Sequence, residues 1–107
     1  MGDTGMGDRG NIIVKDGESE VYLYTHWSGS DLPETLKTAL IKGKSSWDDG
    51  QYLARIIFQE MIGSDNGLTG FGISSVIGDG GTDITVNIQS QSVIFRRKET
   101  PFSEYVA

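Results

Sequence analysis

Two short runs near the start of the chain are typical of strands: the first is a β-branched apolar run, and the second alternates between two faces. The first run covers residues 11–15, the second covers residues 20–27, and Asp16-Gly17 lies between them. Asp-Gly between apolar runs is a strong hairpin signal, because a tight type I′ turn needs central residues that tolerate positive φ. The pattern therefore predicts an antiparallel hairpin as the first structural unit.

The second strand of this hairpin has two unlike faces, because successive side chains of a strand point to opposite sides. One face is apolar and is expected to point into the core. The other is an aromatic row with polar tips, which is unusual for a plain solvent face, and it includes the only histidine of the chain. The inward positions are Val21, Leu23, Thr25 and Trp27, and the outward positions are Tyr22, Tyr24 and His26.

Apolar residues recur at helical spacing between residues 32 and 42, where they form one stripe. Asp31 and Glu34 stand three residues apart at the start of this segment, a variant of the capping box, and Pro33 fits the first turn. Gly43 is a natural residue for the end. The stripe consists of Leu32, Leu36, Ala39 and Leu40. The spacing predicts a helix over residues 32–42.

A second helix is expected after a short linker, with Ser46 or Asp48 as its N-cap and Gly63 at its end. Its apolar residues surround most of its circumference, so we expect it to be central to the fold or covered by another subunit. These residues are Tyr52, Leu53, Ala54, Ile56, Ile57, Phe58, Met61 and Ile62. Arg55 is a cation within this stretch and is expected to need a partner: a glutamate, a carbonyl or a ligand phosphate.

Three further strands are expected at residues 71–77, 84–89 and 93–96, separated by glycine-rich or polar turns. The order strand–strand–helix–helix–strand–strand–strand predicts an α+β fold, in which an antiparallel sheet has both helices packed on one face. We expect a single domain over residues 11–97, between a flexible N-terminal segment at residues 1–10 and a polar C-terminal tail at residues 98–107. Phe102, Tyr105 and Val106 of the tail are able to dock, and the repeat within residues 1–10 leaves Met6 as an alternative natural start.

The net charge of −6 argues against general binding to nucleic acid, which requires a basic surface. The chain has no cysteine and a single histidine. These counts exclude a disulfide framework, a thiolate zinc site and a multi-histidine metal site within one subunit. No apolar run approaches the roughly 18 residues of a membrane helix, and no signal-peptide core is present. We expect a cytoplasmic protein of a bacterial host cell, with no metal and no cofactor.

His26 lies close in sequence to Ser28, Ser30 and Asp31, which suggests a Ser-His-Asp triad, but neighbours at a strand end do not normally have that geometry. A lone histidine acting as acid or base on a nucleotide stays open as an alternative. The glycine loop at residues 78–83, which includes Asp79, matches neither a calcium loop nor a P-loop, and we expect a flexible hairpin there. No catalytic residue is assigned.

The aromatic side chains offer a different chemistry, since purine bases stack on such rings and a few polar groups then fix their orientation. In this interpretation Arg55 holds a phosphate and His26 forms a hydrogen bond. The candidate ligand-binding residues are Tyr22, Tyr24, His26, Trp27, Ser28, Trp47, Tyr52, Arg55 and Phe71. The competing interpretation is a tyrosine-rich sheet face or subunit interface, in which Arg55 pairs with Glu60 or an aspartate.

Three segments carry a resemblance to known proteins: residues 21–33 (VYLYTHWSGSDLP), 47–58 (WDDGQYLARIIF) and 68–74 (LTGFGIS). With them, residues 11–95 resemble a group of small phage and bacterial proteins that has no settled activity. The resemblance implies a small phage-borne accessory protein and assigns no functional residue. Small phage proteins often disarm host defences, either by blocking a protein or by sequestering a nucleotide signal such as a cyclic dinucleotide or a cyclic ADP-ribose isomer.

The sequence as a whole favours a non-enzymatic, homo-oligomeric protein that binds and sequesters a nucleotide-derived small molecule and so counteracts host defence. Homo-oligomerisation is expected from the apolar second helix and from the exposed edges of a small sheet. One alternative is an interaction module that inhibits a host protein. The other is a phosphodiesterase or hydrolase that uses His26.

Overall fold

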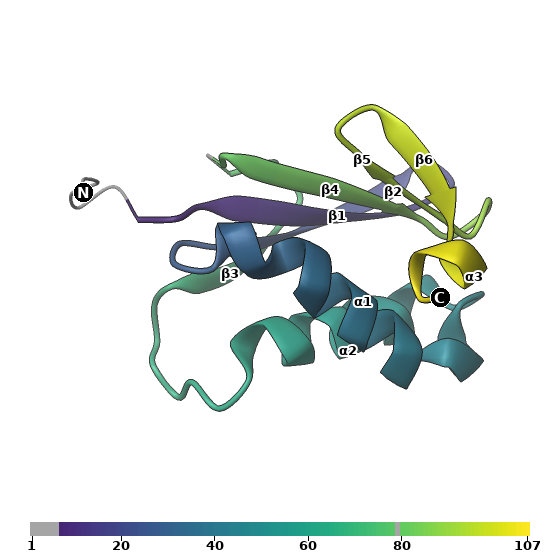
Figure 1. The fold of residues 1–107 in the computed structure, drawn as a ribbon. Helices are drawn as coiled ribbons and strands as arrows, with labels where there is room; N and C mark the ends of the chain where they lie inside the picture. Colours follow the sequence, from purple (N-terminus) through teal and green to yellow (C-terminus); the bar gives the residue numbers. More distant parts are fainter. Residues whose placement is uncertain (1–6, 79) are drawn as a thin grey trace.

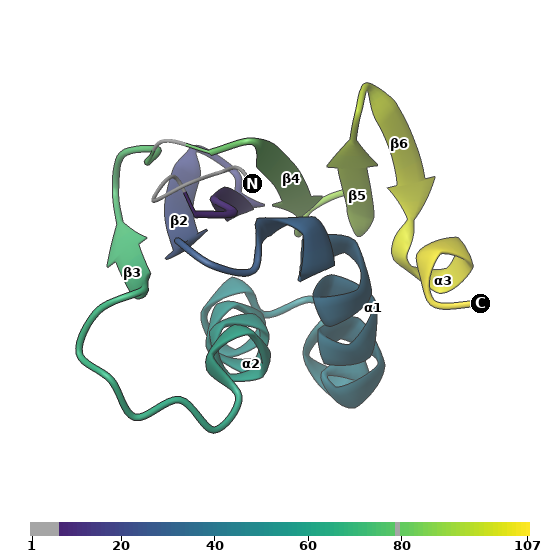
Figure 2. The same ribbon diagram turned by 60° about the vertical axis from the view of Figure 1, so that its left-hand side comes forward.

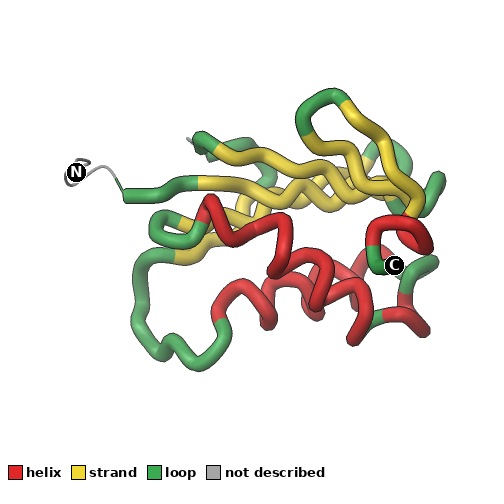
Figure 3. The backbone as a smooth tube through the Cα atoms, viewed as in Figure 1, coloured by secondary structure: helices red, strands yellow, loops and turns green. Residues whose placement is uncertain are grey.

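The computed structural model describes residues 7–78 and 80–107, and its helices and strands form two layers (Figures 1 and 3). The strands are β1 (Gly10–Asp16), β2 (Ser19–Thr25), β3 (Phe71–Ser74), β4 (Thr82–Asn87), β5 (Ser92–Phe95) and β6 (Lys98–Pro101). The helices are α1 (Leu32–Lys42), α2 (Gly50–Ile62) and α3 (Phe102–Tyr105), with short 3-10 turns η1 (Gly29–Asp31) and η2 (Lys44–Ser46). The predicted α+β class is confirmed, and α1 and α2 lie against the same face of the sheet. No helix in the described ranges is long and apolar enough to cross a membrane.

The sheet is mixed, with the strand order β3-β2-β1-β4-β5-β6. β1 and β4 are parallel, whereas all other neighbours in the sheet are antiparallel. The prediction of a purely antiparallel sheet is wrong, because it treated consecutive strands as neighbours. After β3 the chain instead returns across β2 and β1, so that β4 pairs with the second edge of β1. This pairing provides hydrogen-bond partners for both edges of the most buried strand.

The first hairpin is confirmed, with β1 and β2 in register from Gly10 opposite Thr25 to Asp16 opposite Ser19. This register makes Gly17 and Glu18 the central residues of the turn, one position later than the Asp-Gly signal suggested. Gly17 has a φ of +66°, and Glu18 is not among the residues with positive φ. A positive φ at the first central position alone is what a type II′ turn requires.

The core fills the space between the helices and one face of the sheet. α2 directs Leu53, Ile57 and Met61 into this space and packs against α1, β1 and β2. The helix is therefore central, which is one of the two positions expected for it. The buried apolar residues of the core are Ile12, Val14, Leu23, Leu32, Leu36, Ala39, Leu40, Leu53, Ile57, Met61, Ile84, Val86, Ile88, Val93 and Phe102. Burial of each large aliphatic side chain contributes about 1.5–3 kcal/mol.

The two predicted helix caps have different outcomes. Asp31 occupies the N-cap position of α1, as predicted, but it has helical φ and ψ angles of −88° and −10° and makes no side-chain capping bond, because η1 leads straight into α1. An N-cap residue normally has an extended backbone, and Asp31 does not. At α2 the cap is Asp49 rather than Ser46 or Asp48, because η2 delays the start of the helix to Gly50. The Asp49 carboxylate accepts bonds from the backbone N–H groups of Gln51 and Tyr52, each at 3.1 Å.

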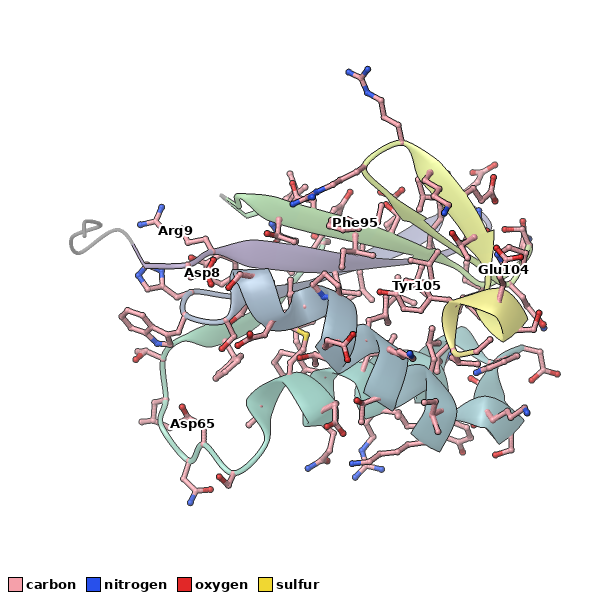
Figure 4. The ribbon with its side chains drawn as sticks, viewed as in Figure 1. Asp8, Arg9, Asp65, Phe95, Glu104 and Tyr105 are labelled. Atoms are coloured by element: carbon pink, nitrogen blue, oxygen red, sulfur yellow. The ribbon has the colours of Figure 1, made fainter. Side chains whose placement is uncertain are left out.

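The segment predicted to be a C-terminal tail completes the fold instead. Lys98–Pro101 forms the edge strand β6, and the ring of Phe102 is buried edge-to-face against Trp47, with 5.3 Å between centroids. The Tyr105 hydroxyl donates to the carbonyl of Pro33 over 2.8 Å and so attaches α3 to α1 (Figure 4). Docking of this segment is confirmed, although its polar composition gave no periodic signal for a strand.

The predicted flexible N-terminal segment is described only from residue 7, so its first part and the alternative start at Met6 lie outside the described residues. The described part is held in place. The backbone N–H of Asp8 donates to the carbonyl of His26 over 2.8 Å, and the N–H of Gly29 donates to the carbonyl of Asp8 over 2.6 Å. These bonds connect the residues just before β1 to the turn that follows β2.

Candidate functional site

The face of the sheet opposite the helices carries the tyrosines of the predicted row. Asn11 lies opposite Tyr24, and Ile13 lies opposite Tyr22, so these residues share one face of the pleated sheet. Leu23 points the other way and is buried in the core. Figure 2 shows that no helix covers this second face. We call it the open face.

A groove of about 290 Å³ lies on the open face where the chain crosses from β3 toward β4. The tyrosine rings and Asn11 line it from the sheet, and residues 76–78 line it from the crossover. Its lining residues are Asn11, Tyr22, Tyr24, Gly72, Ile73, Ser74, Val76, Ile77 and Gly78. Ligand pockets usually enclose roughly 300–1,000 Å³, so this groove suits one small or planar group.

The Asn11 side chain is fully buried, and its oxygen is a hydrogen-bond acceptor without a partner among the described residues. Its Nδ2 donates to the carbonyl of Gly78 and to Oδ1 of Asp83, both over 2.9 Å. Its own Oδ1 is buried without a hydrogen-bond partner among the described residues. A Cβ added at Gly78 would lie 3.5 Å from this oxygen and 3.1 Å from Cδ1 of Tyr24, which places the oxygen beside the groove. A buried acceptor left unpaired costs about 1–3 kcal/mol, which a ligand donor would recover only if the segment around Gly78 moves and exposes the oxygen.

Hydrogen bonds at their hydroxyl groups anchor both tyrosine rings. The Tyr22 hydroxyl donates to Oε1 of Glu20 over 2.6 Å, and this bond raises the pKa of Tyr22 above its ordinary value of 10.0. The hydroxyl of Tyr24 lies 2.9 Å from Nδ1 of His26. The rings are therefore pre-positioned as flat surfaces, which lowers the entropy cost of stacking.

The groove carries no positive charge among the described residues that line it. Two carboxylates hold side chains of the open face, Glu20 through Tyr22 and Asp83 through Asn11, and Lys15 lies opposite Glu20. A carboxylate near a site repels an anion and favours a neutral or cationic group. The groove therefore suits a flat, uncharged group better than an anion.

His26, Trp27 and Ser28 lie at the end of β2, beside the groove but not in its lining. The His26 and Trp27 rings pack edge-to-face, with 4.3 Å between their centroids. The N–H of Ser28 donates to Oγ1 of Thr25 over 3.2 Å. Trp27 is 58% exposed, so its predicted inward position is wrong. The strand ends at Thr25, and strand alternation does not continue beyond that residue.

The other four candidates lie elsewhere. The indole N–H of Trp47 donates to the carbonyl of Leu40 over 2.9 Å, and Phe71, opposite Thr25, packs against the core. Tyr52 and Arg55 are exposed on α2, on the opposite side of the sheet from the groove. Of the nine predicted ligand-binding residues, only Tyr22 and Tyr24 line the groove, so the structure does not bring the set together.

Arg55 makes no hydrogen bond or ion pair with any described residue. Glu60, one of its expected partners, pairs instead with Nζ of Lys42 over 2.8 Å. Because the guanidinium is exposed to water, it needs no partner inside the protein. A ligand held in the groove cannot also reach Arg55 of the same subunit.

The described contacts give His26 no catalytic partner. Its ring meets Tyr24 and Trp27, whereas the hydroxyl of Ser30 donates to the carboxylate of Asp8. That bond, with a second from the N–H of Ser30, holds the pKa of Asp8 below its ordinary value of 3.8. No group of three or more His, Asp or Glu side chains in the described ranges could hold a metal ion. Asp79 of the glycine loop lies outside those ranges.

Sequence reasoning missed the polar centre of the groove and its outer wall. Asn11 opens a strand of β-branched residues and alternates in step with Ile13, which was a usable signal that it shares the face of the tyrosines. The wall formed by Val76 and Ile77 had no such signal, because those residues were assigned to a strand. Only the return of the chain across the sheet after β3 brings them to the groove.

Other cavities have less to offer a ligand. One of about 270 Å³ lies between the first hairpin and the start of α2, and Asp16 and Glu20 are among its lining residues. A helix start usually attracts anions, but Asp49 already occupies this one. The groove on the open face is therefore the best-supported site.

Comparison of the chain with protein-family models, curated proteins and solved structures finds no match in any of the three. The resemblance of residues 11–95 to small phage and bacterial proteins therefore stays a prediction from the sequence. Function has to be inferred from the groove and its chemistry.

Proposed function

We propose that the protein binds a nucleotide-derived small molecule by stacking its base in the groove on the open face. The observation that carries this proposal is the buried, unpaired Oδ1 of Asn11 beside the ring of Tyr24. Adenine, guanine and cytosine all present an amino group next to a flat ring. When the segment around Gly78 moves and exposes the oxygen, one ligand pairs with it and stacks on a tyrosine, and the stacking contributes about 1–3 kcal/mol.

The remainder of the ligand extends into solvent in this proposal. The uncharged lining and the nearby carboxylates do not favour a phosphate inside the groove. Arg55 lies on the other side of the sheet, so the phosphate clamp expected from the sequence has no support within one subunit. A cyclic or otherwise compact ligand with an exposed base fits this arrangement.

Binding without chemistry would make the protein a sequestering agent. The described contacts of His26 include no carboxylate and no serine hydroxyl, which supports storage of the ligand rather than cleavage. The resemblance to phage proteins supplies the biological setting: removal of a cyclic nucleotide or a cyclic ADP-ribose-like immune signal to counteract host defence.

Calorimetric titration of the full chain against nucleosides, cyclic mono- and dinucleotides and ADP-ribose derivatives tests the proposal. We expect binding to at least one of them, with recovery of the ligand intact after denaturation. Tyr24→Leu should weaken binding roughly tenfold to a hundredfold by removing the stacking surface. Tyr52→Leu is the matched control, because Tyr52 is 65% exposed on α2, away from the groove. An absence of binding across the panel, or equal losses in both variants, would overturn the proposal.

A second candidate function is inhibition of a host protein, favoured by the exposed apolar side chains of Leu68, Ile73 and Val76. A stoichiometric protein band captured from host lysate, with no small molecule released by heat, would support it. The third candidate, a phosphodiesterase or hydrolase using His26, has no supporting contact among the described residues. Chromatography that shows every candidate nucleotide intact after incubation would remove it.

A further inference from the structure

The two edges of the sheet differ sharply in how they meet solvent. β6 ends one edge with Lys98, Glu99 and Pro101, the charged and proline residues that protect natural edges from pairing. β3 ends the other edge with Phe-Gly-Ile-Ser, and residues 67–78 around it contain no charged residue. Among the described residues β3 pairs only with β2, so its outer backbone groups are unpaired.

Exposed apolar side chains gather along the β3 edge. The described residues include seven large apolar side chains that are exposed, and only Ile41 and Tyr52 belong to the helices. Leu68 lies just before β3 and Ile73 within it, and Val76 and Ile77 follow it in the crossover that lines the groove. Trp27 adjoins them, since its Nε1 would lie 2.6 Å from a Cβ added at Gly70. Figure 2 shows β3 at the rim of the sheet, with the long loop from α2 leading into it.

We infer that the β3 edge joins two copies of this chain by antiparallel strand pairing. Copies with a net charge of −6 repel one another overall, which favours contact through an uncharged surface, and residues 67–78 provide one. Strand pairing across a two-fold axis uses the same edge on both copies. It would also satisfy the free backbone groups that a small apolar ligand could not.

The exposed apolar side chains supply half or more of the area that a specific dimer needs, and the paired backbone adds to it. Each exposed aliphatic or aromatic side chain would bury roughly 50–100 Å², and both copies contribute the same set, which gives about 500–1,000 Å² before the backbone is counted. A specific interface usually needs about 1,000 Å² in total. We therefore expect a dimer that dissociates at micromolar concentrations.

The inference stands apart from the proposed ligand. Ile73, Val76 and Ile77 belong both to the edge and to the lining of the groove, so the second copy adds a wall to the groove. Dimerisation is nevertheless measured without any nucleotide. A failure of dimerisation is therefore distinguishable from a failure of ligand binding.

Sedimentation of the full chain from micromolar to millimolar concentration tests the dimer. Ile73→Glu places like charges on both sides of the two-fold axis and should raise the dimer Kd roughly tenfold or more. Ile41→Glu is the matched control, because Ile41 is an isoleucine of similar exposure on α1, 53% against 61% for Ile73. It should leave the Kd unchanged. Circular dichroism confirms that both variants are folded.

Hydrogen exchange of the wild-type protein locates the interface. Protection of amides in Phe71–Ser74 should rise with protein concentration if β3 pairs with β3. A protein that stays monomeric at millimolar concentration overturns the inference, as does an equal effect of the two variants. A dimer whose concentration-dependent protection falls on α2 instead of β3 overturns it as well.

Discussion

The two faces of the sheet use the same strands in opposite ways. On the helix-covered face Ile12, Leu23 and Ile84 are apolar and buried under α1 and α2. On the open face a short crossover replaces the helices, and Asn11 and Tyr24 take positions beside the apolar ones. The open face carries a groove and an unpaired buried acceptor beside the tyrosines. The core is thus confined to one side of the sheet, and in the proposed function the other side binds the ligand.

The largest expected effect on the free energy of unfolding comes from β2, where the neighbours Leu23 and Tyr24 point to opposite faces of the sheet. Leu23→Ala should lower the free energy of unfolding by about 2–5 kcal/mol, because it leaves a cavity under the helices. Tyr24→Leu preserves much of the apolar contact and should cost less than about 1.5 kcal/mol. Urea unfolding measures both values.

One result would contradict this difference between the two faces. If Tyr24→Leu destabilised the protein as much as Leu23→Ala, the open face would be a second core rather than a recognition surface. Nucleotide titration of the two variants adds an independent check. Leu23→Ala should bind as the wild type does at a temperature where it is folded, because its side chain does not line the groove.

Asn11 tests how the open face holds its crossover. Asn11→Ala removes two hydrogen bonds, to Gly78 and Asp83, and should lower the free energy of unfolding by about 1–3 kcal/mol. Asn87→Ala serves as the control, because that side chain accepts one exposed bond from the N–H of Ser90. It should cost less than about 1 kcal/mol. Equal costs in the two variants would mean that the buried asparagine does not secure the crossover.

Local patterns predicted the parts of the fold that depend on neighbours in sequence. The hairpin of β1 and β2 and the limits of α1 at Leu32 and Lys42 came from turn chemistry and helical spacing. The parallel pairing of β1 with β4 did not, because nothing local states that the chain returns across the sheet. The same holds for β6, a strand whose polar sequence is ordered only by its pairing with β5.

The candidate site shows the same division. Strand alternation placed Tyr22 and Tyr24 on the face away from the core, and the structure agrees. Spacing along α2 could not show that Tyr52 and Arg55 lie on the far side of the sheet. The position of a helix relative to a sheet depends on packing between distant segments, and it decides which residues can share a ligand.

The smallest expected effect on stability concerns Tyr105, whose hydroxyl is hydrogen-bonded to the carbonyl of Pro33 on the covered side. Burial, and to a lesser degree the charge of Glu34, raises the pKa of Tyr105 above its ordinary value of 10.0. Its phenol therefore keeps its proton better in the folded state than in the unfolded one. The stabilisation is complete below pH 10 and is lost as the pH rises through the folded-state pKa.

Tyr105→Phe should cost about 0.5–1.5 kcal/mol at neutral pH through loss of the bond to Pro33. Above pH 10 the wild type should lose stability more steeply than the variant, since the variant has no phenol to ionise there. The pKa of Tyr22 is also raised, so its ionisation contributes to any loss of stability at high pH that remains in Tyr105→Phe. Urea unfolding between pH 7 and about pH 11 measures the difference. Parallel pH profiles for the two proteins would contradict this expectation. They would show that the Tyr105 phenol ionises while α3 stays packed on α1, so that the covered face is less tightly closed than its burial indicates.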